Sequence, residues 1–462
     1  MKTQSEPSLL HCHDFTQRHR DTEITQRNEK KSPFSNLKIP VFSSVNPCVS
    51  VPLCETPTSF PQRKNPVSPV KKSVTASKRI PLFTFYLLLF TSPLFAQTGT
   101  QVNALRKYLV DTNATPETAI LFGNLKLLSK QGKTLVGQQD PHVTHTGRTD
   151  ESDIKWTTGK ELAVLGSDFM HITNAANTNE TGWFRWEENQ IILRAQKGYD
   201  QGMVNIFCWH VRDPYLEKSF NVRDLPEDIH HTCFRSLLPG AENHEWYQKK
   251  LQKVAEVLNK IKGENGTLSP VIFRPFHEFD GDWFWWGKPY CTPDEYKQLW
   301  RFTVTYLRDE LKVRNVLYAF SPDCRFSTEE EFLERYPGDA FVDLVGFDDY
   351  WDFETHNIEA AAQKLKVISD ISKKHKKVAA LTEVGYRREP IPDTLYTDYY
   401  GKAFADPTLE IAFLMFWRQG KEGESNYFVP PPTAPTADNF KAFLQHPRML
   451  LLPDIPSLYE WR

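Results

Sequence analysis

Eight short, nearly continuous apolar runs recur between residues 134 and 419, separated by longer amphipathic stretches. A parallel strand that is buried on both faces has this appearance in a sequence. The stretches at residues 245–261, 295–311 and 358–374 carry apolar residues at helical spacing. The eight runs occupy residues 134–139, 162–169, 203–210, 271–278, 315–322, 344–350, 378–385 and 412–419.

This alternation of strand and helix predicts an α/β protein with a (β/α)8 TIM barrel, a fold that takes roughly 200 to over 400 residues. A doubly wound open sheet is the alternative. In a nucleotide-binding role it would need a glycine-rich phosphate turn, and neither G-x-G-x-x-G nor G-x-x-x-x-G-K-[ST] occurs in the chain. The sequence therefore argues against NAD, ATP or GTP as a ligand.

Composition changes abruptly near residue 97 of the 462-residue chain. The first 96 residues contain no glycine and no tryptophan, and they hold 13 basic and 6 acidic residues. The remainder holds 43 basic and 52 acidic residues, a formal net charge of −9, together with all 21 glycines and all 12 tryptophans. We expect one acidic globular domain over residues 97–462, whose charge disfavours nucleic acid as a partner.

An uncharged apolar run at residues 80–90 lies inside the leader, after four basic residues between positions 71 and 79. A positive stretch, a short apolar run and an exit at Ala96 are typical of a secretory signal peptide. The run is shorter than the roughly 20 apolar residues of a transmembrane helix. We expect a signal peptide over residues 70–96 and an exported protein, periplasmic or secreted, without a membrane span after cleavage. A signal anchor is the alternative.

Residues 1–69 are rich in proline and serine and lack periodicity, so they cannot bury a core. We expect translation to begin near Val70, which would leave this segment outside the protein. A genuine disordered extension is the alternative.

Polar and ring-bearing residues gather where the predicted strands end. The carboxyl ends of barrel strands form the active site of TIM-barrel enzymes. A single carboxylate there would be read as a hydrogen-bonded rim residue, but five such strand ends together indicate a common site. These residues are His210, His277, Glu278, Asp348, Asp349, Tyr350, Glu383, Trp417 and Arg418.

Two glutamates carry the chemistry that we expect, because Glu278 ends the fourth run and Glu383 ends the seventh. A retaining glycosidase needs a proton donor and a nucleophile of this type, about 5–5.5 Å apart. The acid must stay protonated near neutral pH while its partner stays ionised. His277 and the aromatic run beside Glu278 offer the acid an apolar setting. Arg274 and Tyr350 are the donors expected to keep Glu383 ionised and oriented.

The loop after Glu278 contains three tryptophans in four residues, Trp283, Trp285 and Trp286. Aromatic rings with a polar edge suit the apolar faces and hydroxyl groups of sugars. We expect Trp283 and Trp286 to bind sugar, although one or two of the three rings should pack on the loop itself. Trp417 is a separate candidate platform.

The motif Arg274-Pro275-Phe276-His277-Glu278, followed by Gly281 and residues 283–287, resembles the acid/base motif of glycoside hydrolase family 26. The best-known members of this family are β-mannanases. Residues 202–210, 336–350, 381–385 and 416–418 resemble, in order, its third, sixth, nucleophile and eighth strand motifs. The resemblance covers about residues 115–450.

The resemblance implies that Glu278 is the acid/base and Glu383 the nucleophile of a double displacement. It also implies that Arg418 reaches a neighbouring glycone subsite. Together with the residue patterns, it gives an expected substrate-binding set: His210, Arg274, His277, Trp283, Trp286, Tyr350, Trp417 and Arg418. The sequence departs from the family at Phe279, where many members have methionine, and at residues 138–140, where a histidine is common.

We expect no metal and no cofactor. The domain's four cysteines form no C-x-x-C pair and are too sparse for a disulfide scaffold. His142 and His145 lie in one loop without a carboxylate partner, so we expect them to be solvated or to contact sugar.

The sequence thus predicts a monomeric endo-β-1,4-mannanase that acts on β-mannan or a related plant cell-wall polysaccharide. Two alternatives stay open within and outside the enzyme class. One is a β-1,3-xylanase or mixed-linkage β-glucanase on the same scaffold, and the other is a carbohydrate-binding relative that has lost catalysis.

Overall fold

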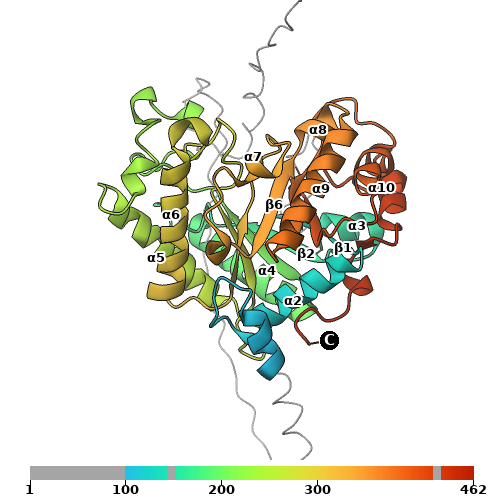
Figure 1. Ribbon diagram of the computed structural model, residues 1–462, viewed down its shortest axis with the longest axis horizontal. Helices are drawn as coiled ribbons and strands as arrows, with labels where there is room; N and C mark the ends of the chain where they lie inside the picture. The colour runs from blue at the N-terminus through green and yellow to red at the C-terminus, as the bar shows by residue number, and fades with distance from the viewer. Residues whose placement is uncertain (1–98, 143–150, 420–427, 462) are drawn as a thin grey trace, which may run out of the picture. The chain divides into compact units, whose positions relative to one another are not determined.

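The computed structural model describes residues 99–142, 151–419 and 428–461. Within these residues, eight parallel strands follow the order β2-β3-β4-β5-β6-β7-β8-β1, and β1 pairs again with β2 (Figure 1). The sheet is therefore closed, which confirms the predicted (β/α)8 barrel and excludes the open sheet. The strands are β1 (Thr134–Gln139), β2 (Val164–Asp168), β3 (Val204–Trp209), β4 (Val271–Pro275), β5 (Val316–Phe320), β6 (Leu344–Asp349), β7 (Val378–Val384), β8 (Phe413–Phe416) and the added β9 (Met449–Leu450), which pairs with β1.

Helices cover the outside of the barrel (Figure 1). The predicted helix at residues 358–374 is α9, and the one at 245–261 is α5 shifted by one residue. The stretch at 295–311 divides into α6 and a π-helical turn at Tyr306–Glu310. The α-helices are α2 (Pro116–Lys130), α3 (Asp153–Thr158), α4 (Trp183–Gln201), α5 (His244–Lys260), α6 (Pro293–Thr305), α7 (Glu329–Leu333), α8 (Trp351–Glu354), α9 (Ile358–Lys374) and α10 (Ala437–Leu444).

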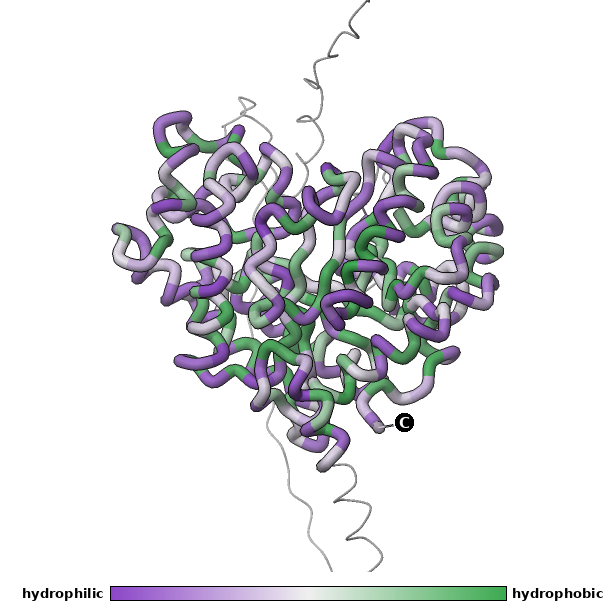
Figure 2. Tube along the Cα trace, in the orientation of Figure 1, coloured by the Kyte–Doolittle hydropathy of each residue, from purple (hydrophilic) through white to green (hydrophobic). Residues whose placement is uncertain are grey.

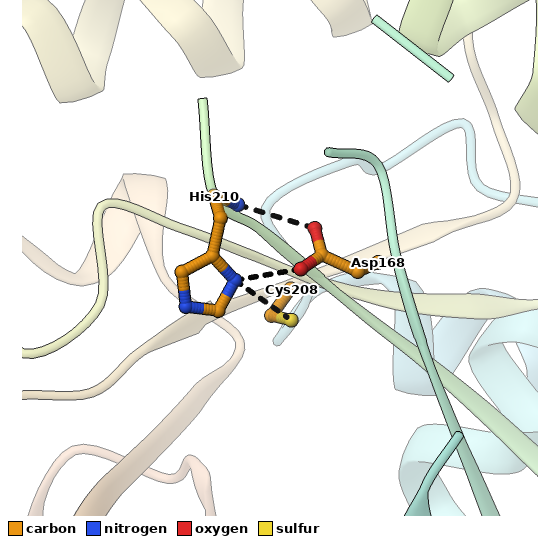
Figure 3. Close-up of side chains that lie close together, drawn as sticks. All are labelled: Asp168, Cys208 and His210. Atoms are coloured by element: carbon orange, nitrogen blue, oxygen red, sulfur yellow. Dashed lines mark hydrogen bonds and ion pairs between the residues drawn. The ribbon is translucent and has the colours of Figure 1, made fainter. Parts of the chain in front are cut away.

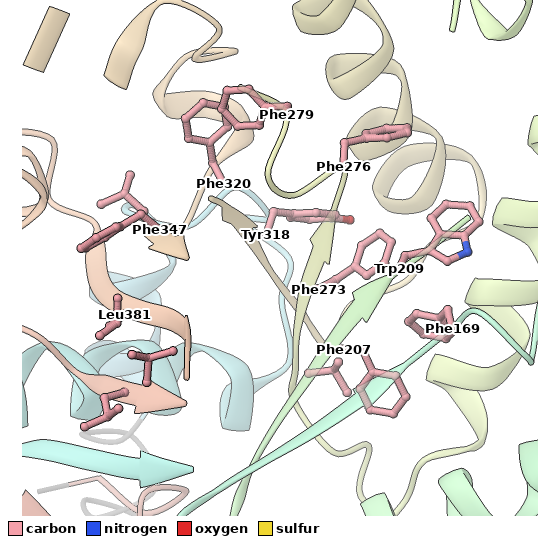
Figure 4. Packing of buried hydrophobic residues seen from close by; sticks show 14 of the residues in the cluster. Phe169, Phe207, Trp209, Phe273, Phe276, Phe279, Tyr318, Phe320, Phe347 and Leu381 are labelled. Carbon is pink, nitrogen blue, oxygen red and sulfur yellow. The ribbon is translucent and has the colours of Figure 1, made fainter. Parts of the chain in front are cut away.

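Two apolar layers explain why the strand sequences are continuous runs. Along β3, Val204 and Ile206 belong to the cluster that fills the barrel, whereas Phe207 and Trp209 belong to the cluster between barrel and helices. Successive side chains of a strand point to opposite faces, so both faces are apolar here. Figure 2 shows the hydrophobic trace concentrated in the centre, and Figure 4 shows aromatic rings of the outer layer around Phe207 and Phe273.

The barrel interior becomes polar at the carboxyl ends of the strands. Arg274 near the end of β4 and Asp348 near the end of β6 are both fully buried. A shift in the β6–β7 register between Phe347 and Asp348 places Asp348 directly opposite Glu383. This irregularity brings the side chains of Arg274, Asp348 and Glu383 together inside the barrel, near the carboxyl ends of the strands.

Among the residues that the structure describes, no helix is long and apolar enough to cross a membrane. The predicted leader at residues 1–69 and the predicted signal peptide at 70–96 lie outside the described residues.

Candidate active site

The chain leaves β4 through strained backbone on both sides of His277. Strand β4 ends at Pro275, three residues earlier than the apolar run predicts. The reason is that Phe276 (φ 49°) and Glu278 (φ 52°) adopt the left-handed region, which costs a non-glycine residue about 1–3 kcal/mol. The N–H of Glu278 donates to the carbonyl of Ser321 at 3.0 Å and anchors this turn.

Glu278 and Glu383 meet at the mouth of the barrel. With Asp348, each places a carboxylate oxygen within 4.8 Å of the other two, and all three residues are buried. Retaining glycosidases hold their two carboxyl groups about 5–5.5 Å apart, whereas inverting enzymes hold them about 6.5–9.5 Å apart. The close approach of Glu278 and Glu383 fits the first arrangement.

Glu383 receives hydrogen bonds on both of its oxygens. The Nη2 atom of Arg274 donates to Oε1, and the hydroxyl of Tyr350 donates to Oε2 at 2.9 Å. Arg274 also donates to Asp348 from Nη1, at 2.7 Å. Both donors that the sequence indicates for Glu383 are therefore in contact with it, and a single guanidinium balances two buried carboxylates.

The surroundings of Glu278 and Glu383 act differently on the pKa values of the two side chains. Burial is the main cause that raises the pKa of Glu278 well above its ordinary value, and the negative charges of Glu383 and Asp348 add to it. Burial, then Asp348, raises the pKa of Glu383 to about 8, while Arg274 and Tyr350 act in the opposite direction. Because the Arg274 cation and the Tyr350 hydroxyl donate to Glu383 and not to Glu278, the surroundings favour the ionised form at Glu383 and the protonated form at Glu278.

Trp283 lies against the proton donor. Its indole Nε1 donates to Oε2 of Glu278 at 2.6 Å, and the guanidinium of Arg325 lies 4.9 Å from its ring centroid. A Cβ atom on Gly281 would lie 2.5 Å from the Trp283 ring, so the ring occupies the space that glycine leaves. Trp283 is half-buried.

The expectation that Trp286 binds sugar is not supported. Trp286 is fully buried, stacks on Phe284 with centroids 4.5 Å apart, and donates its indole N–H to the carbonyl of His277 at 2.7 Å. Trp286 therefore stabilises the turn before Glu278 through its hydrogen bond to the His277 carbonyl. Arg274 and His277 are also fully buried, so we assign them to supporting the glutamates and His210 rather than to direct sugar contact.

His210 belongs to a chain of hydrogen bonds that starts at Asp168, the last residue of β2 (Figure 3). Oδ2 of Asp168 lies 2.6 Å from Nδ1 of His210, and Nε2 of His210 lies 3.1 Å from Nε2 of His277. His210 lowers the pKa of Asp168, although burial opposes this. The carboxylate thus accepts the Nδ1 proton of His210, and a proton on one of the two Nε2 atoms forms the hydrogen bond to the other.

Trp417 and Arg418 follow the end of β8 and are half-buried. The ring of Trp417 lies 5.9 Å from that of His210, so it lies beside the hydrogen-bonded chain of Asp168, His210 and His277. The charge of Arg418 lowers the pKa of Asp140, which burial raises to about 6. Arg418 therefore faces the end of β1.

Three groups of potential metal ligands occur among the described residues. In each group, at least one ligand atom already binds a lysine, an arginine or a hydrogen-bonded proton of the protein. Arg274 contacts Asp348 and Glu383 in the first group. Lys364 pairs with Asp352 in the second, beside Cys324 and Asp349. The third is Asp168, Cys208 and His210, where burial keeps the thiol pKa high. His145 lies outside the described residues.

Sequence reasoning missed Asp168, although its position at the end of β2 follows the same strand-end rule as the other site residues. It named Asp348 among the strand-end residues without giving it a role at the site. It also missed the pair Glu354 and Arg387, which contacts Tyr350. These two residues lie on a short helix and a loop, where no periodic pattern marks them.

The geometry agrees with comparisons to known proteins. Residues 110–422 match the model of Glycosyl hydrolase family 26. A mannan endo-1,4-beta-mannosidase of Bifidobacterium adolescentis is 32% identical over 356 residues, 73% of this chain, and the chain spans 34% of that relative's length. One from Bacillus subtilis strain 168 is 33% identical over 290 residues, which cover 59% of this chain and 73% of that protein.

Solved structures give the same result. GH26C from Muricauda is 43% identical with a TM-score of 0.76, covering 78% of this chain and 98% of the other. A GH26 beta-mannanase from Bacteroides ovatus is 31% identical with a TM-score of 0.67, covering 75% and 98%. The family match over residues 110–422, the closed barrel and these similarities lead to one conclusion: this chain belongs to glycosyl hydrolase family 26.

Proposed function

We propose that this chain hydrolyses internal β-1,4 bonds of mannan by double displacement, with retention of the anomeric configuration. The observation that carries the mechanism is the close approach of Glu278 and Glu383, within 4.8 Å, although β4 and β7, which position them, are separated by β5 and β6 in the barrel. The two mannan endo-1,4-beta-mannosidases compared above support the substrate.

In the first step the Glu383 carboxylate attacks the anomeric carbon, and the bond to the leaving sugar oxygen breaks. Glu278 gives its proton to that oxygen. Arg274 and Tyr350 donate to the two oxygens of Glu383, which favours its ionised form and fixes the direction of its attack. The product is a covalent glycosyl ester of Glu383.

In the second step Glu278, now ionised, takes a proton from water, and the water oxygen attacks the anomeric carbon. The ester bond breaks and Glu383 leaves as a carboxylate. We assign Trp283 to the leaving-group side because it touches Glu278, and Trp417 and Arg418 to the other side.

The deciding experiment measures release of reducing sugar from mannan, lichenan and β-1,3-xylan side by side. We expect mannan to be cleaved fastest, and a preference for either other polymer would reassign the substrate. Glu383→Ala should abolish turnover without unfolding the protein, and NMR should show the β-anomer as first product. Binding of mannan without any product would indicate a relative that has lost catalysis.

We also propose that the protein is exported through a signal peptide at residues 70–96, ending near Ala96, and acts as a monomer. The basic residues before the apolar run support the export. Peptide mapping of the secreted product tests it, because a product that retains residues 1–69 would refute both the export signal and the start near Val70. Light scattering tests the oligomeric state.

A further inference from the structure

The ring of Tyr350 lies under the positive charge of Arg387. The guanidinium carbon of Arg387 is 4.5 Å from the ring centroid, well within the range of a cation–π contact. Arg387 is only four residues beyond Glu383, in the loop after β7. The hydroxyl of Tyr350 donates to Glu383. The ring of Tyr350 is therefore covered by a cation from the loop that follows the strand of Glu383.

Glu354 on α8 fixes this cation. Its Oε1 accepts from Nε of Arg387 at 2.7 Å and from the Arg387 backbone N–H at 2.9 Å, and its Oε2 accepts from Nη2 at 3.2 Å. The carboxylate of Glu354 is 4% exposed and the Arg387 side chain 16%. Two-point binding of this kind restricts the guanidinium plane as well as its position.

The other neighbours of Tyr350 leave its ring little room. Phe428 packs edge-on, with centroids 6.2 Å apart. A Cβ atom on Gly385 would lie 2.9 Å from the Tyr350 ring and 2.4 Å from Phe428. The backbone N–H of Glu354 also donates to the Tyr350 carbonyl at 2.9 Å. Glu354 and Arg387 together therefore connect the end of β6, helix α8 and the loop after β7.

We propose that Arg387, held by Glu354, is a positioning residue that fixes the ring of Tyr350 so that its hydroxyl donates to Oε2 of Glu383. The inference rests on the function proposed above. Burial raises the pKa of Tyr350 well above its ordinary value, and nearby carboxylates add to it, while Arg387 opposes them. The cation thus also favours the phenol as a donor.

A double-mutant cycle of Arg387→Met and Tyr350→Phe tests the proposal, with mannohexaose as substrate. If Arg387 acts through Tyr350, Arg387→Met lowers kcat about 10-fold and changes KM less than about twofold. In the Tyr350→Phe background the same substitution then has almost no further effect on kcat. Additive effects, an unchanged kcat or a loss confined to KM would each overturn it.

Arg388→Met is the matched control. Arg388 lies 3.8 Å from the same Glu354 carboxylate, but its guanidinium covers Trp351, 5.4 Å from that ring. We expect its kcat to equal that of the wild type. A loss as large as that of Arg387→Met would mean that the loop, and not the contact with Tyr350, matters.

A second variant secures the test if Arg387→Met does not fold. Arg387→Lys keeps the charge and loses the two-point contact, so its kcat should lie below that of the wild type by less than about 10-fold, at a melting temperature near that of the wild type. A folded Lys variant with the kcat of the wild type would contradict a role of the two-point contact, and one whose kcat falls about 10-fold or more would contradict a role of the charge. If the proposed function is wrong, the wild-type enzyme does not cleave mannan, which is a different outcome from a failure of the double-mutant cycle. The cycle is then measured with whichever polymer the wild type cleaves.

Discussion

The indole Nε1 of Trp283 donates to Oε2 of Glu278 at 2.6 Å, so the ring that we propose to contact the leaving-group sugar also binds the proton donor. This bond favours the charged form of Glu278 and lowers its pKa, against the larger effect of burial. Substrate contact and acid strength are therefore linked through one side chain.

Trp283→Phe should raise the pKa of Glu278 further, because it removes that hydrogen bond. Glu278 acts in its protonated form, so the basic limb of the kcat/KM profile should move to higher pH. The pH dependence of kcat/KM on mannan measures this, with Trp186→Phe at an exposed site on α4 as control. A shift of the limb to lower pH would contradict the assignment.

Glu278→Ala should lower kcat/KM on mannan by about 10²–10⁴-fold, the usual contribution of a positioned acid. The loss in kcat/KM should be far smaller with an aryl glycoside whose leaving group needs no proton, because kcat/KM reports the first step and not the later activation of water. Comparing both substrates checks the role, since a residue that only shaped the site would affect the two alike. Glu383→Ala, in contrast, should inactivate the enzyme towards both.

Arg274→Met should lower the free energy of unfolding at pH 7 by about 3–5 kcal/mol, because it leaves two carboxylates buried without their cation. Loss of the cation raises the folded-state pKa of Asp348 and Glu383. The folded state then binds more protons than the unfolded state, so the loss should shrink as the pH falls.

Urea unfolding at pH 5 and pH 7 measures the effect of Arg274→Met. Adding Asp348→Asn should recover part of the stability, since it removes one of the two unpaired charges. A double variant that is less stable than Arg274→Met would show that Asp348 has another buried role.

Gly281→Ala should displace the Trp283 ring, because the added Cβ would lie 2.5 Å from it. We expect a higher KM for mannan and a weaker hydrogen bond from Trp283 to Glu278, with the fold retained. Steady-state kinetics measures KM directly, and the pH dependence of kcat/KM reports the change at Glu278. Gly99→Ala is the control, since a Cβ there would meet nothing within 4 Å; equal effects in the two variants would refute the role of Gly281.

The loop after β4 shows where sequence reasoning reached its limit. Three tryptophans in four residues indicated an unusual loop, and Trp283 lies against Glu278. Trp286 instead packs beneath the turn because the left-handed backbone at Phe276 and Glu278 folds the loop back over His277. Backbone strain of this kind has no signature in residue composition.

The sequence by itself determined the barrel and the place of its two glutamates. Apolar runs at strand length, each followed by polar residues, suffice for this because parallel strands bring all their carboxyl ends to one edge. The residue pattern also indicated Arg274 and Tyr350 as the donors to Glu383. The tertiary structure alone decided how Asp348 and Asp168 join the site, because the shift in the β6–β7 register sets Asp348 opposite Glu383 and Asp168 reaches His210 across 42 residues. Such contacts depend on register and packing between distant segments, which local residue patterns do not encode.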